Sequence, residues 1–148
     1  MKTASPLPLL IELAQKEADE AAGKLSTLLA NQRQSEQKLN LLLGYRAEYQ
    51  QRLCNSAEEG IERTELQNFG VFLRKLSDAI EQQQSELKHW QSHVEAAREI
   101  WQQTQRKLKS FGILEQRRQD TLSAQAGRHQ QKVTDEFAAR SSQAKHLN

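Results

Sequence analysis

The sequence predicts an all-α fold, a long antiparallel two-helix coiled-coil hairpin with a C-terminal helical overhang. The first observation is composition, because only 36% of the 148 residues are hydrophobic while 27% are charged. This leaves too little apolar surface for a thick core, and the dominant residue types favour helices over strands. The second observation is a pair of apolar arrays with a 3.5-residue period, and the third is the single short polar stretch that separates them.

The first array starts near the N-terminus and advances by four and three residues in alternation. Its members are apolar or aromatic except Gln32, Ser35 and Arg46. Ser5 followed by Pro6 suits a helix start, because a proline in the first turn removes no backbone donor that the helix needs. The array comprises Leu7, Ile11, Ala14, Ala18, Ala21, Leu25, Leu28, Gln32, Ser35, Leu39, Leu42, Arg46, Tyr49 and Leu53.

The second array follows the same alternation, and only Gln83 and Thr104 interrupt its apolar character. A 3.5-residue spacing held over this length keeps one narrow stripe facing a partner helix, as in a left-handed coiled coil. We call the positions of the two arrays the seam. The second array comprises Phe69, Leu73, Leu76, Ile80, Gln83, Leu87, Trp90, Val94, Ala97, Trp101, Thr104, Leu108 and Phe111.

The stretch between the arrays is small, polar and turn-forming. Thr64 and Gln67 after it match a capping box, in which each side chain satisfies a backbone donor at the helix start. We therefore expect one elongated domain, 1–148. It consists of helix one over about 6–54, a turn over about 55–63, helix two over about 64–140 and a disordered tail over about 141–148.

A short turn makes the two helices antiparallel neighbours, so facing residues should have numbers that sum to about 118. Leu7 then faces Phe111, and the seam ends where its partner helix ends. Residues 112–140 remain as an overhang without an intramolecular partner, roughly 43 Å long at 1.5 Å per residue. Its few apolar side chains do not offset the cost of ordering it, so we expect it to fray until a partner binds.

Several classes of function are excluded by these patterns. Cys54 is the only cysteine, which excludes an intrachain disulfide and suits a reducing compartment. No apolar run approaches the roughly 20 residues of a membrane-spanning helix, so we expect a cytoplasmic chain without direct membrane insertion. A two-helix hairpin has no cleft that would desolvate a catalytic carboxylate, and no phosphate-binding loop is present, so we expect neither an enzyme nor a cofactor.

Two further charged or polar patterns are interpreted as solvated surface. The 21 basic and 19 acidic residues are interspersed, which favours a protein partner over a nucleic acid. His89 and His93 stand four residues apart, a spacing that can share a metal ion. No third ligand obviously completes a tetrahedral set, so the sequence predicts no metal site.

Three stretches carry a resemblance to a known family. YRAEYQQRL (45–53), FLRKLSDAIEQ (72–82) and KVTDEFAAR (132–140) resemble the flagellar export protein FliJ family, and LAQKEADEAA (13–22) fits as well. The resemblance spans nearly the whole chain in length and order. It implies an antiparallel hairpin that acts as the stalk of a hexameric type III export ATPase, FliI. It also implies contact with the export-gate protein FlhA and recycling of chaperones such as FlgN and FliT.

The resemblance places the gate-binding face near the turn. Tyr45 and Phe72 lie one position off the seam, so each should keep an exposed edge, and partly exposed aromatics are common binding hot spots. The register puts Tyr49 near Phe69 and Tyr45 near Leu73. Lys38 and Gln83 lie at the rim of this face, at two positions where the resemblance leads us to expect other polar residues. The face comprises Lys38, Leu42, Tyr45, Tyr49, Phe72, Leu76, Ala79 and Gln83.

The overhang is the predicted ATPase-ring surface, because it offers apolar and basic groups without a partner in the chain. These are Arg117, Arg118, Leu122, Arg128, Lys132, Val133 and Phe137. The predicted function is thus a stalk and coupling component of flagellar type III protein export, held peripherally at the cytoplasmic side of the inner membrane through the export apparatus. The alternatives are the stalk of a virulence secretion system and a coiled-coil secretion chaperone or adaptor.

Overall fold

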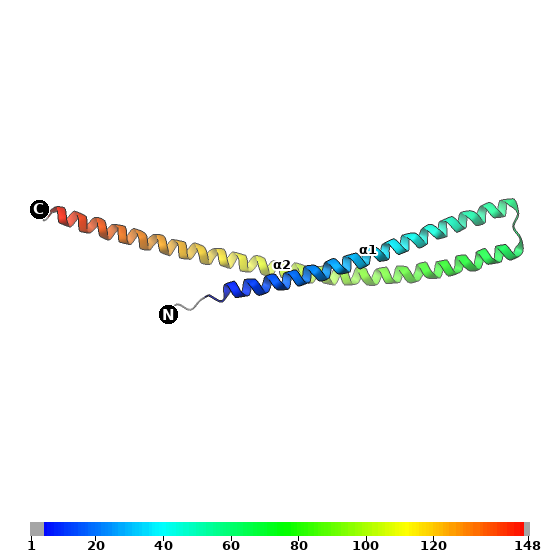
Figure 1. Cartoon of the computed structure of the whole chain (residues 1–148), viewed down its shortest axis with the longest axis horizontal. Helices are drawn as coiled ribbons and strands as arrows, with labels where there is room; N and C mark the ends of the chain where they lie inside the picture. Colours follow the sequence, from blue (N-terminus) through cyan, green and yellow to red (C-terminus); the bar gives the residue numbers. More distant parts are fainter. Residues whose placement is uncertain (1–4, 147–148) are drawn as a thin grey trace. The chain divides into compact units, whose positions relative to one another are not determined.

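The chain folds into two long α-helices in a computed structural model that describes residues 5–146 (Figure 1). Helix α1 spans Leu7–Glu59 and helix α2 spans Arg63–His146. None of the described residues forms a β-strand. The all-α prediction is therefore confirmed, and the two helices pack against each other as a hairpin.

Local interactions explain where the helices begin and end. The Ser5 hydroxyl accepts the backbone N–H of Leu7 at 3.2 Å, which confirms the predicted cap. At the other end of α1, Gly60 has a φ of 90°, a conformation that L side chains rarely adopt. Gly60 thus ends α1 in the manner of a left-handed C-terminal cap.

The turn is shorter than predicted. Helix α1 continues through residues 55–59, which were expected in the turn, because the seam's apolar period can stop while helical hydrogen bonding continues. Helix α2 begins at Arg63, and its first bond runs from the Leu66 N–H to the Glu62 carbonyl at 3.0 Å. Glu62 therefore occupies the N-cap position, and the capping box predicted at Thr64 is wrong by two residues.

The C-terminal boundary also differs from the prediction. Helix α2 extends to His146, so residues 141–146 are helical where a disordered tail was expected. This stretch contains Ala144 and Lys145 and no glycine or proline, so nothing in its local sequence ends the helix. Residues 147–148 of the predicted tail lie outside the described residues.

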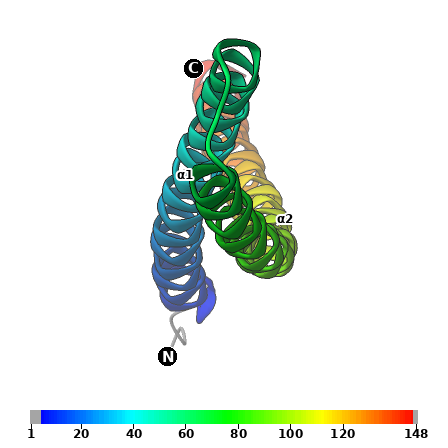
Figure 2. The same ribbon diagram turned by 90° about the vertical axis from the view of Figure 1, so that its right-hand side faces the viewer.

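The chain divides into two compact units. One unit combines the start of α1, through Glu17, with α2 from Thr104 onward, and the other comprises Ala18–Gln103. Within the second unit α1 and α2 lie side by side and antiparallel, joined by the turn at Gly60 (Figures 1 and 2). The single domain expected from the sequence remains a prediction.

The seam positions form the core of both units. Every position of the two arrays is buried or half-buried, whereas most residues that lie outside the arrays are exposed. Their regular burial confirms the 3.5-residue pattern. The most buried apolar members are Ala14, Ala18, Leu76, Ile80, Val94 and Ala97.

The predicted register is confirmed by a contact between the helices. Ser35 of α1 and Gln83 of α2, whose numbers sum to the expected value, are joined by two hydrogen bonds. In the other unit, Lys107 Nζ lies 3.2 Å from Glu17 Oε2, also bridging α2 and α1. Both members of that ion pair are about half exposed, so it contributes little to stability.

The overhang has no packing partner among the described residues. From residue 119 to residue 145 every position is exposed, although α2 continues throughout. Just before this stretch, Glu115 and Arg118 are half-buried at positions that continue the seam. The seam therefore stops within two turns of the point where α1 begins.

Candidate protein-binding surfaces

An aromatic cluster lies close to the turn in the 18–103 unit. The rings of Tyr49 and Phe72 meet with centroids 4.4 Å apart and planes tilted by 41°. Tyr49 and Phe72 also line a shallow groove together with Phe69, Glu65 and Asn68. The predicted approach of Tyr49 to Phe69 is thus seen as a shared groove, while the direct ring contact is with Phe72.

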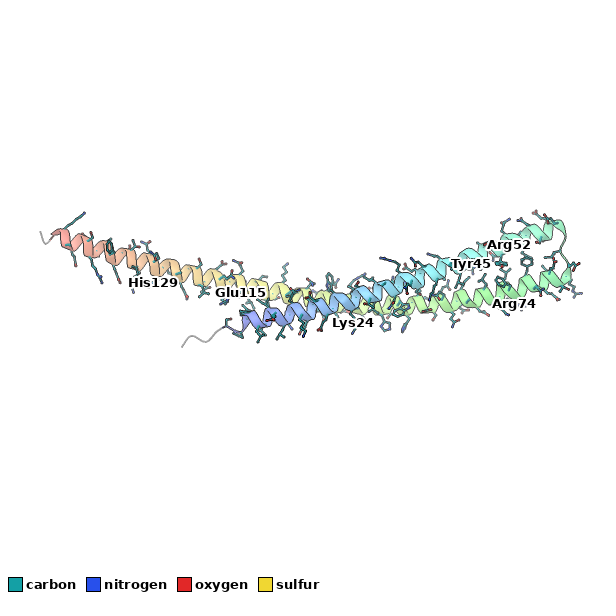
Figure 3. All side chains as sticks on the ribbon, in the orientation of Figure 1. Lys24, Tyr45, Arg52, Arg74, Glu115 and His129 are labelled. Carbon is teal, nitrogen blue, oxygen red and sulfur yellow. The ribbon has the colours of Figure 1, made fainter. Side chains whose placement is uncertain are left out.

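The groups around Tyr49 on α1 are charged. The Arg52 guanidinium lies 5.3 Å from the centroid of the Tyr49 ring, within the range of a cation–π interaction. Arg52 also donates to Glu48 Oε1 at 2.9 Å. Tyr45 and Arg52 lie on the α1 side of this region and Arg74 on the α2 side (Figure 3). Arg52 was not among the predicted site residues, although its i,i+3 spacing from Tyr49 could have indicated the contact.

The structure divides the eight predicted gate residues into three sets. Tyr45 and Phe72 are 45% and 41% exposed, and Lys38 is exposed, so these side chains are accessible. Leu42, Tyr49 and Ala79 are half-buried. Leu76 is buried in the seam, and the side-chain amide of Gln83 is engaged by Ser35, so both serve the hairpin itself.

Exposed apolar side chains that the sequence reasoning did not single out lie near this cluster. Leu41 is 56% exposed and lines a hollow with Lys38, Gln34 and Gln37. Leu66 and Val71 are exposed close to the start of α2. All three fall off the seam, and an apolar residue off the seam was the available signal.

The predicted ring residues share the single helix of the overhang. Leu122, Val133 and Phe137 are 52%, 48% and 75% exposed. Their separations of 11 and 4 residues place them on one helix face, because these are close to three turns and one turn. We call these three residues the overhang stripe.

Charged side chains accompany the overhang stripe. Arg118 lies one turn before Leu122, Lys132 adjoins Val133, and Arg117 and Arg128 lie farther around the helix. The Arg128 Nε–H donates to the Ala124 carbonyl at 3.5 Å. Glu115 and His129 lie on this same helix (Figure 3).

Arg118 is hydrogen-bonded to another side chain of α2. Its Nε and Nη2 donate to the two carboxylate oxygens of Glu115 at 3.0 and 2.8 Å, a bidentate pair. The hydrogen bonds from Arg118 hold the pKa of Glu115 below its usual range although desolvation acts in the opposite direction, and Gln119 adds a further donor. The same contact raises the pKa of Arg118.

Neither helix, within the residues described, is long and apolar enough to cross a membrane.

The aromatic cluster near the turn and the overhang are both lined by aromatic, aliphatic and basic side chains on helices, an arrangement suited to protein contacts.

The sequence is similar to those of known flagellar proteins over nearly its whole length. Residues 2–146 match the family described as Flagellar FliJ protein. The Flagellar FliJ protein of Salmonella typhi is 32% identical over 139 residues, which cover 94% of this chain and 95% of that protein. The Flagellar FliJ protein of Escherichia coli (strain K12) is 30% identical over 139 residues with the same coverage. The chain therefore belongs to the FliJ family and is a flagellar export component.

Proposed function

We propose that this chain is the non-enzymatic stalk of the flagellar type III export apparatus. It binds the hexameric export ATPase FliI through the overhang and the export gate FlhA through the aromatic cluster near the turn, and it assists recycling of chaperones such as FlgN and FliT. The observation that carries the proposal is a long stretch of α2, residues 119–145, that is exposed throughout. A helix without tertiary packing has only marginal stability in water, so a partner that packs against this stretch would stabilise it.

The overhang stripe supports contact with the ATPase. Burial of one Leu, Val or Phe side chain contributes about 1.5–3 kcal/mol, and Leu122, Val133 and Phe137 retain much of that potential. The neighbouring basic groups add electrostatic complementarity to an acidic or mixed lining. A single helix is also narrow, about 10–12 Å across with side chains, which suits insertion into a ring.

The aromatic cluster supports contact with the gate. Tyr45 and Phe72 offer large, partly exposed side chains, and the Tyr49–Phe72 contact holds one of them in place. Aromatic anchors fixed before binding lose little conformational entropy on association. Leu76 and Gln83 act indirectly in this scheme, by maintaining the hairpin beneath the cluster.

The same scheme implies a cellular location. Binding to FlhA and FliI would hold the chain peripherally at the cytoplasmic side of the inner membrane. The flagellar names of the two relatives favour a flagellar stalk over the equivalent stalk of a virulence system.

A pull-down against FliI, combined with an ATPase assay, tests the proposal. A chain ending at Phe111 keeps both apolar arrays but lacks the overhang stripe, so it should lose ATPase binding and stimulation while it still folds and binds FlhA. The triple variant Leu122→Ala, Val133→Ala and Phe137→Ala should show the same loss without truncation. Gln131→Ala, about half a turn from the stripe, is the matched control and should bind normally.

The outcomes separate a stalk from a chaperone or adaptor. Unchanged ATPase stimulation by the truncated chain and by the triple variant would show that the overhang is dispensable. Failure of the full-length chain to bind FliI, with retained binding of exported clients, would favour the chaperone or adaptor class instead.

A further inference from the structure

His89 and His93 face each other on one exposed side of α2. Their Nε2 atoms are 3.1 Å apart, and their ring centroids are 4.4 Å apart with an angle of 75° between the planes. Both residues are exposed and both lie off the seam, so their rings are accessible to solvent. Neither residue belongs to the gate or ring surfaces described above.

The separation of the two nitrogens matches a chelate. If both Nε2 atoms bound one ion at about 2.0–2.1 Å, a 3.1 Å separation would give an N–metal–N angle of about 100°. That value lies between the right angle of octahedral or square-planar coordination and the tetrahedral angle. The side chains would need little rearrangement to bind an ion.

The protonation chemistry is also compatible. In the observed contact, one Nε2 carries the hydrogen and the other accepts it. A neutral imidazole can place its proton on Nδ1 instead, which leaves the Nε2 lone pair free for a metal. An ion between the two rings would replace the single shared hydrogen.

We propose that His89 and His93 form a two-ligand chelating site for a late first-row divalent metal ion such as Ni²⁺ or Zn²⁺. Imidazole nitrogen suits these ions, whereas Mg²⁺ and Ca²⁺ prefer oxygen. Within residues 5–146, no group of three or more His, Cys, Asp or Glu side chains is placed to hold a metal. Water therefore completes the coordination shell, and the open positions face solvent.

Trp90 gives the site a built-in reporter. Its ring centroid is 6.0 Å from that of His89 and 6.3 Å from that of His93. A paramagnetic ion such as Ni²⁺ bound between the two histidines should quench the emission of this indole. The bound ion also links side chains one turn apart, so it should stabilise α2 locally.

The test is a titration of the full-length chain with Ni²⁺ and with Zn²⁺, followed by calorimetry and, for Ni²⁺, by tryptophan emission. The chain should bind one ion with quenching. His89→Gln and His93→Gln should each weaken binding by roughly 100-fold, because loss of one of two linked ligands removes the chelate. Glutamine keeps a helix-favouring side chain, so the fold is retained.

Two control variants separate the chelate from other metal contacts. His129→Gln removes a histidine elsewhere on α2 and should leave binding unchanged. Cys54→Ser removes the exposed thiol and should also leave binding unchanged. The proposal is overturned if Ni²⁺ and Zn²⁺ bind no more tightly to the native chain than to the His89→Gln and His93→Gln variants, or if the Cys54→Ser variant loses the site.

Discussion

The side-chain amide of Gln83 donates to Ser35 Oγ at 2.9 Å and to the Ser35 carbonyl at 3.2 Å, joining α2 to α1 within the seam. Ser35 is only 3% exposed and is the buried polar residue of the described chain. Each residue looked like a break in an apolar array. In the structure the two residues hydrogen-bond to each other. A shift of one helix against the other by one heptad would place both residues opposite apolar side chains. Buried polar contacts of this kind specify the register of coiled coils.

The first prediction concerns this contact. Gln83→Ala should lower the free energy of unfolding by about 1–2 kcal/mol, because the Ser35 hydroxyl loses its partner. In a double-mutant cycle, Ser35→Ala and Gln83→Ala should show a coupling energy of at least about 0.5 kcal/mol. Urea unfolding followed by circular dichroism measures both quantities.

Gln84→Ala is the matched control for the register contact. Gln84 adjoins Gln83 but is exposed, so its replacement should change stability by less than about 0.5 kcal/mol. Additive effects of the Ser35 and Gln83 substitutions would contradict a coupled register contact.

The second prediction concerns the aromatic cluster. Replacing Tyr45, Tyr49 and Phe72 together by alanine should abolish binding to FlhA while preserving most of the helix content, since alanine favours helices and deletes contact area. Loss of the Tyr49–Phe72 contact alone should lower stability by about 0.5–1.5 kcal/mol beyond the lost burial. Surface plasmon resonance and circular dichroism measure the two effects.

Val71→Ala provides the control for the cluster. Val71 is adjacent to Phe72 and 42% exposed, but it points about 100° away around α2. Its replacement should leave FlhA binding intact. If the triple variant is folded and still binds FlhA, the aromatics are packing residues only.

The third prediction concerns acid sensitivity at the start of the overhang. The pKa of Glu115 is lowered by its hydrogen bonds from Arg118, so the ionised carboxylate is favoured in the folded chain. A lowered pKa contributes stability that is present above the usual carboxyl pKa and is lost as pH falls through the folded value. Helix content around Glu115 should therefore fall in acid and remain constant near neutral pH.

Arg118→Gln tests the cause of this shift. It should return the Glu115 pKa toward its usual range, as measured by carboxyl-carbon NMR during a pH titration. Arg117→Gln is the matched control, because no contact joins Arg117 to Glu115, and it should leave the titration nearly unchanged. A Glu115 titration that is the same in both variants would rule out the bidentate pair as the cause.

The sequence alone determined the repeating part of this protein. The structure buries or half-buries every position that the 3.5-residue period identified, because burial along two packed helices follows directly from helical geometry. The antiparallel register followed from the place of the turn, and the Ser35–Gln83 contact agrees with it. The unpartnered overhang followed from the helix that continues past the second array, beyond the start of its partner helix, and the exposure of residues 119–145 bears it out.

Only the tertiary structure decided what lies off the repeat. Tyr49 meets Phe72 directly, although the register pointed to Phe69, because a long side chain at the seam's edge chooses its partner by rotamer as well as by position. The accessibility of Phe72, one position off the seam, likewise depends on the packing of both helices. The turn shortened to Gly60–Glu62 because helical hydrogen bonding outlasted the apolar pattern until a glycine allowed the chain to reverse.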